Sequence, residues 1–303
     1  MDKTLRRGSL EMTAAMLISG TIGWFVLVSG QPVLDVVFWR CVFGAATLLL
    51  ICAGFGFLRP GILTRTTFML AVLSGVAIVG NWVLLFASYS RASIAIGTAV
   101  YNVQPFMLVG LAALFLGERI TGQKLFWLAI SFLGMLAIVS AHGEQGQGGE
   151  DYLAGIALAL GAALLYAIAA LIIKRLTGTP PHLIALIQVS TGVLLLAPWA
   201  NFSALPQQAA AWASLVTLGM VHTGVMYVLL YSAIQRLPTA LTGALSFIYP
   251  IAAIFVDWFA FGHRLEALQW LGVAAILLAA AGMQQGWTLK WRRSSPAVTD
   301  QKM

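Results

Sequence analysis

The chain has 303 residues, of which 60% are hydrophobic and 9% are charged, and its mean hydropathy is +0.91. A soluble domain carries about 25% charged residues, so this composition excludes a soluble globule and predicts a protein whose outer surface contacts lipid. The formal charge of +7 does not indicate nucleic-acid binding, because the basic residues lie in short loops between apolar runs and no basic stretch alternates with exposed aromatics.

Ten apolar runs follow one another along the chain, each close to the 20 or so residues that a helix needs to cross the hydrocarbon core. They lack the alternating pattern of barrel strands, so helices are predicted. In chain order the predicted spans are Met12–Ser29, Val33–Phe57, Phe68–Ser88, Ser93–Leu116, Leu125–Ala141, Tyr152–Ile173, His182–Trp199, Ala211–Ile234, Thr239–Phe259 and Ala267–Trp287.

The first span is expected to remain in the protein and to act as its own insertion signal. Met1–Glu11 is basic, but the run after it lacks a clear small-residue cleavage site. Cys41 and Cys52 lie eleven residues apart in the second span, about 16 Å along a helix, which is too far for a disulfide. We therefore interpret both cysteines as packing residues.

The basic residues predict the orientation of the spans, because cytoplasmic loops collect Lys and Arg. With the N-terminus inside, 14 of the 17 basic residues fall in inner segments. Arg91 and Arg264 then lie outside, and Arg40 lies within the second span. With an odd number of spans, the basic residues would be divided between the two sides of the membrane. We therefore expect an even number of spans, with both termini in the cytoplasm.

Residues 145 positions apart match in type along the two halves. The matched pairs are Arg91 with Arg236, Pro105 with Pro250, Gly117 with Gly262, Arg119 with Arg264, Trp82 with Tyr227, and Phe86 with Tyr231. Such a repeat decides the architecture. We expect residues 1–145 to form one five-helix repeat and residues 146–290 a second, with a cytoplasmic tail over 291–303.

Five spans per half is an odd number, so the second half must insert with the opposite orientation. The fold class predicted is therefore an all-α integral membrane protein, with ten transmembrane helices in two inverted five-helix repeats around a central cavity. Inverted repeats are typical of secondary transporters, whose substrates bind near the midplane between the halves. They also occur in channels and a few membrane enzymes, and duplication can be structural history alone.

Ten spans in this arrangement resemble the EamA-type branch of the drug/metabolite transporter superfamily. The fourth span carries a proline and ends in Leu116-Gly117-Glu118-Arg119, similar to the Gly-Glu turn of that family. The second half departs from the pattern, with His263 in place of the glutamate. Arg40, Gln188, Trp24 and Tyr166 also resemble family positions. The resemblance implies a cavity lined by spans one, three, four, six, eight and nine, and it favours bacterial exporters of amino acids and related metabolites.

Polar and aromatic residues near the middle of those spans are the candidate substrate-binding residues, because polar groups in lipid should face a wet cavity or a partner. They are Trp24, Asn81, Trp82, Tyr101, Asn102, Gln104, Tyr166, His222, Tyr227, Ser246 and Tyr249. Pro105 and Pro250 each remove a backbone donor and are expected to kink their helices near the binding level. Amides and phenols suit a carboxylate and an amine, and aromatic faces suit an apolar side chain or an ammonium.

Several of these residues have structural alternatives. Asn81 can bond a neighbouring helix, His222 can be a packing residue or a proton carrier, and Trp24 can belong to an interfacial belt. Arg40 and Asp35 are expected near the outer interface. The small residues Ala275 and Ala279 make the tenth span a possible dimer face.

The sequence thus predicts a non-enzymatic exporter of small metabolites in the bacterial inner membrane, most simply of amino acids including aromatic and other neutral ones. Its expected partners are a small-molecule substrate and the lipid bilayer, with no nucleic acid, no cofactor and no metal, as a monomer or weak homodimer. Another amphiphilic metabolite or a drug is an alternative cargo, and a passive channel is an alternative mechanism. No phosphate-binding loop for ATP-driven transport is found in the sequence.

Overall fold

The computed structural model describes residues 3–59, 61–92, 97, 100–140, 150–203, 205–261 and 267–287. Every regular element in these ranges is helical. The first half holds α1 (Lys3–Ser19), α2 (Ile22–Ser29), α3 (Val33–Gly54), α4 (Arg65–Ala92), α6 (Gln104–Leu116) and α7 (Gly122–Ser140). The second half holds α8 (Glu150–Arg175), α9 (Pro181–Leu196), η1 (Ala197–Trp199), α10 (Ala209–Gly219), η2 (Met220–Val225), α11 (Met226–Arg236), α12 (Thr239–Ser246), α13 (Ile248–Phe261) and α14 (Ala267–Gln285).

The helices account for the ten predicted spans. Within the described residues, 6 helical stretches are long and apolar enough to cross a membrane: Lys3–Ser29, Val33–Gly54, Arg65–Tyr89, Asp151–Arg175, Pro181–Trp199 and Ala209–Arg236. Shorter apolar helices occupy the positions of the other four spans: Gln104–Leu116, Gly122–Ala137, Thr239–Ala252 and Trp270–Met283. The fourth predicted span begins at residues 93–96, which lie outside the described ranges.

The outer surface of the bundle is apolar. Leu50 (75%), Leu114 (74%), Leu194 (78%) and Phe259 (79%) are among the large hydrophobic side chains that the protein itself leaves exposed. A contiguous apolar surface of this kind is stable in lipid and not in water. The chain is therefore a multi-pass membrane protein.

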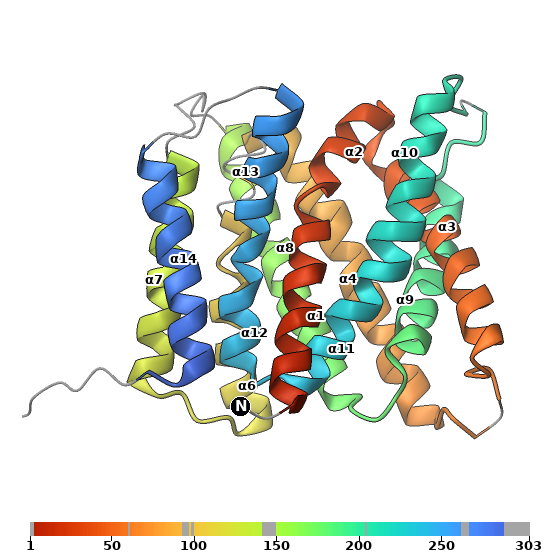
Figure 1. The fold of residues 1–303 in the computed structure, drawn as a ribbon. Helices are drawn as coiled ribbons and strands as arrows, with labels where there is room; N and C mark the ends of the chain where they lie inside the picture. The colour runs from red at the N-terminus through yellow and green to blue at the C-terminus, as the bar shows by residue number, and fades with distance from the viewer. Residues whose placement is uncertain are drawn as a thin grey trace, which may run out of the picture.

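The packing of the helices is symmetric between the two halves: the most extensive contacts between spans have equivalent contacts between their counterparts in the other half (Figure 1). The third span, α4, packs on the sixth, α8, and the equivalent first and eighth spans pack likewise as α1 on α11. Equivalent spans also meet each other, α7 with α14, α6 with α12 and α3 with α9. In Figure 1, α7 and α14 form one edge of the bundle and α3 and α9 lie toward the other. This symmetry is the packing expected of two inverted five-helix repeats.

Small residues bring α7 and α14 close together. A Cβ placed on Gly134 would lie 2.8 Å from the carbonyl oxygen of Gly272 and 3.1 Å from the Cβ of Ala275. Ala279, one turn further along α14, is fully buried. The small-residue face of the tenth span, a possible dimer face by sequence, thus packs against α7 within the chain.

Polar contacts join the two halves at the face that carries the start of α1, where α6 and α11 also end (Figure 1). An Arg236 Nη1 lies 2.5 Å from a carboxylate oxygen of Glu11. Lys174 Nζ lies 3.3 Å from Glu118 Oε1, and the Thr239 hydroxyl donates to the same oxygen at 2.6 Å. Glu118, which belongs to the Gly-Glu turn after the fourth span, therefore connects the first repeat to two helices of the second.

Candidate substrate cavity

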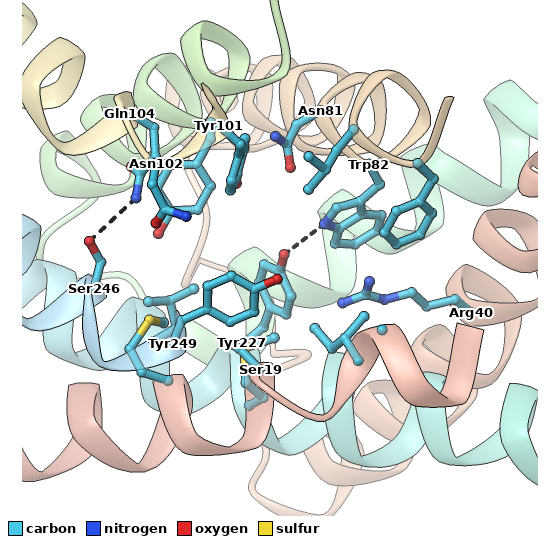
Figure 2. Close-up of a pocket in the computed structure, with 18 of the residues that line it drawn as sticks. Ser19, Arg40, Asn81, Trp82, Tyr101, Asn102, Gln104, Tyr227, Ser246 and Tyr249 are labelled. Atoms are coloured by element: carbon cyan, nitrogen blue, oxygen red, sulfur yellow. Dashed lines mark hydrogen bonds between the residues drawn. The ribbon is translucent and has the colours of Figure 1, made fainter. Parts of the chain in front are cut away.

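A cavity of about 100 Å³ lies between the halves (Figure 2). Both repeats build its wall: α1, α2, α3, α4 and α6 come from the first repeat, and α8, α11, α12 and α13 come from the second. The sequence-predicted residues that line it are Asn81, Trp82, Tyr101, Asn102, Gln104, Tyr166, Tyr227, Ser246 and Tyr249. The structure adds the second span to the helices that the family resemblance implied.

An aromatic pair in the cavity wall joins the two halves. The indole Nε1 of Trp82 donates to the hydroxyl oxygen of Tyr227 at 2.8 Å, and their ring centroids lie 5.4 Å apart in an edge-to-face arrangement. Tyr101 and Tyr166 form a second edge-to-face pair with centroids 6.2 Å apart. These rings give the cavity apolar faces with a polar edge.

Amide side chains also line the cavity. Gln104 Nε2 donates to the Ser246 hydroxyl at 3.4 Å, and that hydroxyl donates to the Gly243 carbonyl at 2.7 Å. The Gln104 Oε1 is buried and accepts no hydrogen bond from the described residues. Asn81 both lines the cavity and donates to the Ala162 carbonyl on α8 at 2.8 Å, so it bonds a neighbouring helix as well.

Arg40 lines the cavity, which corrects the expectation that it lies near the outer interface. Its side chain is 1% exposed, and its guanidinium carbon lies 4.2 Å from the centroid of the Trp82 ring. Figure 2 shows the guanidinium directed into the cavity beside Trp82 and Tyr227. Asp35 lies elsewhere and accepts a hydrogen bond from the Asn201 backbone at 2.9 Å.

A π-helical turn in the eighth span holds Arg40 in place. In η2 the N–H of Met226 donates to the Val221 carbonyl, five residues back, instead of the His222 carbonyl four residues back. The His222 carbonyl accepts from Arg40 Nη2 at 3.1 Å, and Thr223 Oγ1 accepts from Arg40 Nε at 2.8 Å. The irregular turn thus supplies both acceptors of the guanidinium.

Glycines allow α3 to approach this turn closely enough for those bonds. A Cβ on Gly219 would lie 2.3 Å from the Phe43 Cβ, and one on Gly44 would lie 2.7 Å from the Thr223 Cγ2. Any larger residue at either position would push α3 away from α10 and η2. The glycine spacing therefore sets the position of Arg40.

Two of the predicted binding residues lie outside the cavity wall. His222 is buried behind it, with Nε2 at 2.6 Å from the Thr21 hydroxyl and Nδ1 at 3.2 Å from the Thr217 carbonyl. The first of these contacts joins η2 to the break between α1 and α2. Trp24 is 37% exposed and packs edge-to-face on Phe25.

The two prolines each follow an interruption in their span. Pro105 lies in the first turn of α6, directly after the turn at Asn102 and Val103. Pro250 lies in the first turn of α13, which begins after the break at Phe247. Proline is favoured in a first helical turn because the N–H that it lacks has no partner there. The sequence predicted bends at these levels, and the structure has broken helices there.

The comparison with known proteins decides the family. The sequence matches the EamA-like transporter family over residues 6–140 and again over residues 153–284. The chain belongs to this family. EamA-like proteins form part of the drug/metabolite transporter superfamily that the sequence resembled.

Similar proteins occur in bacteria and archaea, and two of the three described here are named as transporters. The uncharacterized transporter YxxF of Bacillus subtilis is 30% identical to this EamA-like chain, and the match covers 96% of this chain and 92% of YxxF. An uncharacterized transporter of Archaeoglobus fulgidus is 26% identical, with 94% and 98% covered. Protein RarD of Escherichia coli is 28% identical over 65% of this chain and 62% of its own. A solved crystal structure with 19% identity has the same fold, with a TM-score of 0.77 over 90% of this chain and 96% of the other.

Sequence reasoning missed several residues of this EamA-like cavity. Met16, Ser19, Ile22 and Gly23 line it at the break between α1 and α2, and nothing in their types distinguishes them from other residues of an apolar span. Arg40 did carry a signal, because a charge eight residues into an apolar helix is costly unless a cavity or partner receives it.

Proposed function

We propose that this protein is a secondary transporter that exports small amphiphilic metabolites, most simply amino acids including aromatic and other neutral ones, across the bacterial inner membrane. Membership of the EamA-like family makes it a transporter. The observation that carries the rest is the cavity whose wall both inverted halves share, with Trp82 from one half bonded to Tyr227 from the other. Rocking of the halves would open such a site to one face at a time.

The chemistry of the wall supports an amino acid as cargo. Tyr101 and Tyr166 present rings to an apolar or aromatic side chain, and Asn102 and Gln104 present amides to polar groups. Within the described part of the wall the charged side chain is a single arginine, with no acidic cage for a polycation and no basic cluster for a phosphorylated sugar. A molecule that combines one carboxylate, one amine and a variable side chain fits these groups.

The orientation that we propose follows the distribution of basic residues. Most of them lie in segments on the side of the N-terminus, so both termini are placed in the cytoplasm and the ion pairs of Glu11 and Glu118 face inward. Export then begins with entry into the cavity from that face.

Counterflow in proteoliposomes tests this function. Vesicles containing the full chain and preloaded with unlabelled phenylalanine should accumulate labelled phenylalanine transiently and saturably, and empty vesicles should not. A panel of neutral amino acids, dipeptides and a lipophilic drug then defines the cargo. Flux that rises linearly with concentration and shows no counterflow would indicate a channel, and counterflow with the drug alone would replace amino acids as the substrate class.

A further inference from the structure

We infer that Arg40 is the binding site for the carboxylate group of the transported molecule. This inference rests on the proposed function, because it specifies which part of the cavity receives which part of the cargo. It begins from the position of the guanidinium, which is 1% exposed and forms part of the cavity wall (Figure 2).

No carboxylate in the described part of the chain neutralises the charge of Arg40. Within the described residues no carboxylate forms an ion pair with Arg40, whereas Glu11, Asp35 and Glu118 have other partners. An isolated cation in a low-dielectric site is costly, and the cost falls when an anion with matching hydrogen-bond geometry arrives. The cavity thus has a charge that an anionic ligand would complement.

The hydrogen bonds of Arg40 fix its plane and leave donors for a ligand. Nε donates to Thr223 Oγ1, Nη2 donates to the His222 carbonyl, and the Tyr227 side chain also interacts with the guanidinium, which together leave at least two of its five N–H groups for a ligand. The Trp82 ring lies against the guanidinium, 4.2 Å from its carbon to the ring centroid. A planar guanidinium held in this way is suited to a carboxylate, which accepts two parallel N–H bonds.

The sequence of the turn suggests that the structure is built to hold this charge. A regular α-helix would bond the His222 carbonyl to Met226, but the π-turn gives that N–H to Val221 and the carbonyl to Arg40. The close approach of Gly44 and Gly219 to their neighbours is also needed for these bonds. If Arg40 served only to join helices, an acidic residue on η2 could hold it equally well. The turn contains no acidic residue, because its sequence is Met-Val-His-Thr-Gly-Val.

Gln104 offers a hydrogen-bond acceptor at the end of the cavity opposite Arg40. Its Oε1 is buried without a donor from the described residues, and Figure 2 shows Gln104 and Ser246 at the opposite end of the cavity from Arg40. The aromatic rings of Tyr101, Tyr227 and Tyr249 lie between the two ends. A ligand whose carboxylate meets Arg40 therefore directs its remaining length past these rings toward an amide acceptor.

Two matched ligand pairs test the carboxylate site. The first is phenylalanine with phenylalaninamide, and the second is phenylacetate with phenylacetamide, which lacks the amine. Binding of each is measured to the purified full chain in detergent by quenching of tryptophan fluorescence and by the shift in thermal unfolding. The wild type should prefer each carboxylate over its amide by about tenfold to a hundredfold, the range for hydrogen bonds to a charged group.

Variants at Arg40 should remove this preference. Arg40→Gln should bind the acid and the amide of each pair within about threefold of each other, and Arg40→Lys, which keeps the charge without the planar fork, should fall between. Arg65→Gln, at an exposed position on α4, is the matched control and should retain the wild-type ratio. The ratio of two ligands on one protein is insensitive to a loss of folded material, so a merely structural arginine would leave it unchanged.

The outcomes separate the inference from the function. Phenylacetate binding that depends on Arg40, without any amino-acid counterflow, would support the carboxylate site and overturn the amino-acid cargo. Amino-acid counterflow with the same acid-to-amide ratio in the wild type and in Arg40→Gln would support the function and overturn the inference. A wild type that prefers neither carboxylate would overturn the inference as well.

Discussion

The indole N–H of Trp82 donates to the hydroxyl oxygen of Tyr227 at 2.8 Å, and the two residues lie 145 positions apart, the offset of the internal repeat. Equivalent positions of the two halves thus meet at the pseudo-two-fold axis. Tyr227→Phe removes the acceptor alone and should lower the free energy of unfolding by about 1–3 kcal/mol, since a buried N–H loses its partner.

The double variant isolates this bond. Trp82→Phe with Tyr227→Phe should destabilise by less than the sum of the single changes, because the second substitution has no bond left to break. Thermal unfolding of the four proteins in one detergent measures the cycle, and counterflow measures its effect on transport. Strict additivity would show that the pair does not join the halves energetically.

The approach of α3 to α10 predicts a strong effect at Gly219. A methyl group there would lie 2.3 Å from the Phe43 Cβ, so Gly219→Ala should destabilise the protein by about 1–3 kcal/mol and should weaken the preference for carboxylate ligands. Gly110→Ala is the control, because a Cβ at Gly110 meets nothing within 4 Å and alanine favours a helix by about 0.5–1 kcal/mol. Equal stability of the two variants would contradict the close packing.

His222 is expected to support the structure and not to carry the coupling proton. Its ring joins η2 to Thr21 at the break between α1 and α2, and it lies outside the cavity wall. His222→Ala should slow counterflow by the same factor with and without a pH gradient across the vesicle membrane. A variant that lost a gradient-driven component and kept the gradient-free rate would assign His222 a proton-carrying role.

The ion pairs between the halves should hold the N-terminal face closed. Glu118→Gln weakens the contact with Lys174, and Glu11→Gln weakens that with Arg236. Partly exposed pairs are worth up to about 1 kcal/mol, so each change should shift the balance between the two access states by at most about fivefold.

Cysteine labelling from each face measures this shift. A cysteine placed at Ser246 in the cavity wall should react faster with a reagent added at the N-terminal face in the glutamine variants than in the parent. Asp151→Asn, at an exposed position on α8, is the control and should leave the rate unchanged. Slower labelling in both glutamine variants would show that these pairs favour opening of that face.

The fold was largely predictable because hydropathy and the repeat offset are properties of whole segments. Ten spans and their inverted pairing follow from lengths, charges and matched residues such as Pro105 and Pro250. The breaks before those prolines also follow a local rule, since proline favours a first turn. No tertiary knowledge is needed for either.

The cavity was predictable only where residue type distinguished the lining from the packing. Polar and aromatic residues such as Asn102 and Tyr249 stand out in an apolar span, and the structure places both in the wall. His222 stands out equally, but its side chain faces Thr21. The direction of that side chain depends on the π-turn, which cannot be recognised from the sequence. Arg40 was placed wrongly for the same reason, since its acceptors come from a turn more than 180 residues away.

The position equivalent to Arg40 in the second half is Ala185, which is 1% exposed. The two repeats are therefore alike in shape but unlike in charge, and the cavity has one polarised end. A substrate whose carboxylate is bound to Arg40 could not rotate within the cavity without breaking that ion pair. It would keep one orientation relative to the protein throughout transport. A molecule entering from one side of the membrane would therefore meet Arg40 differently from one entering from the other side, although the scaffold is nearly symmetric.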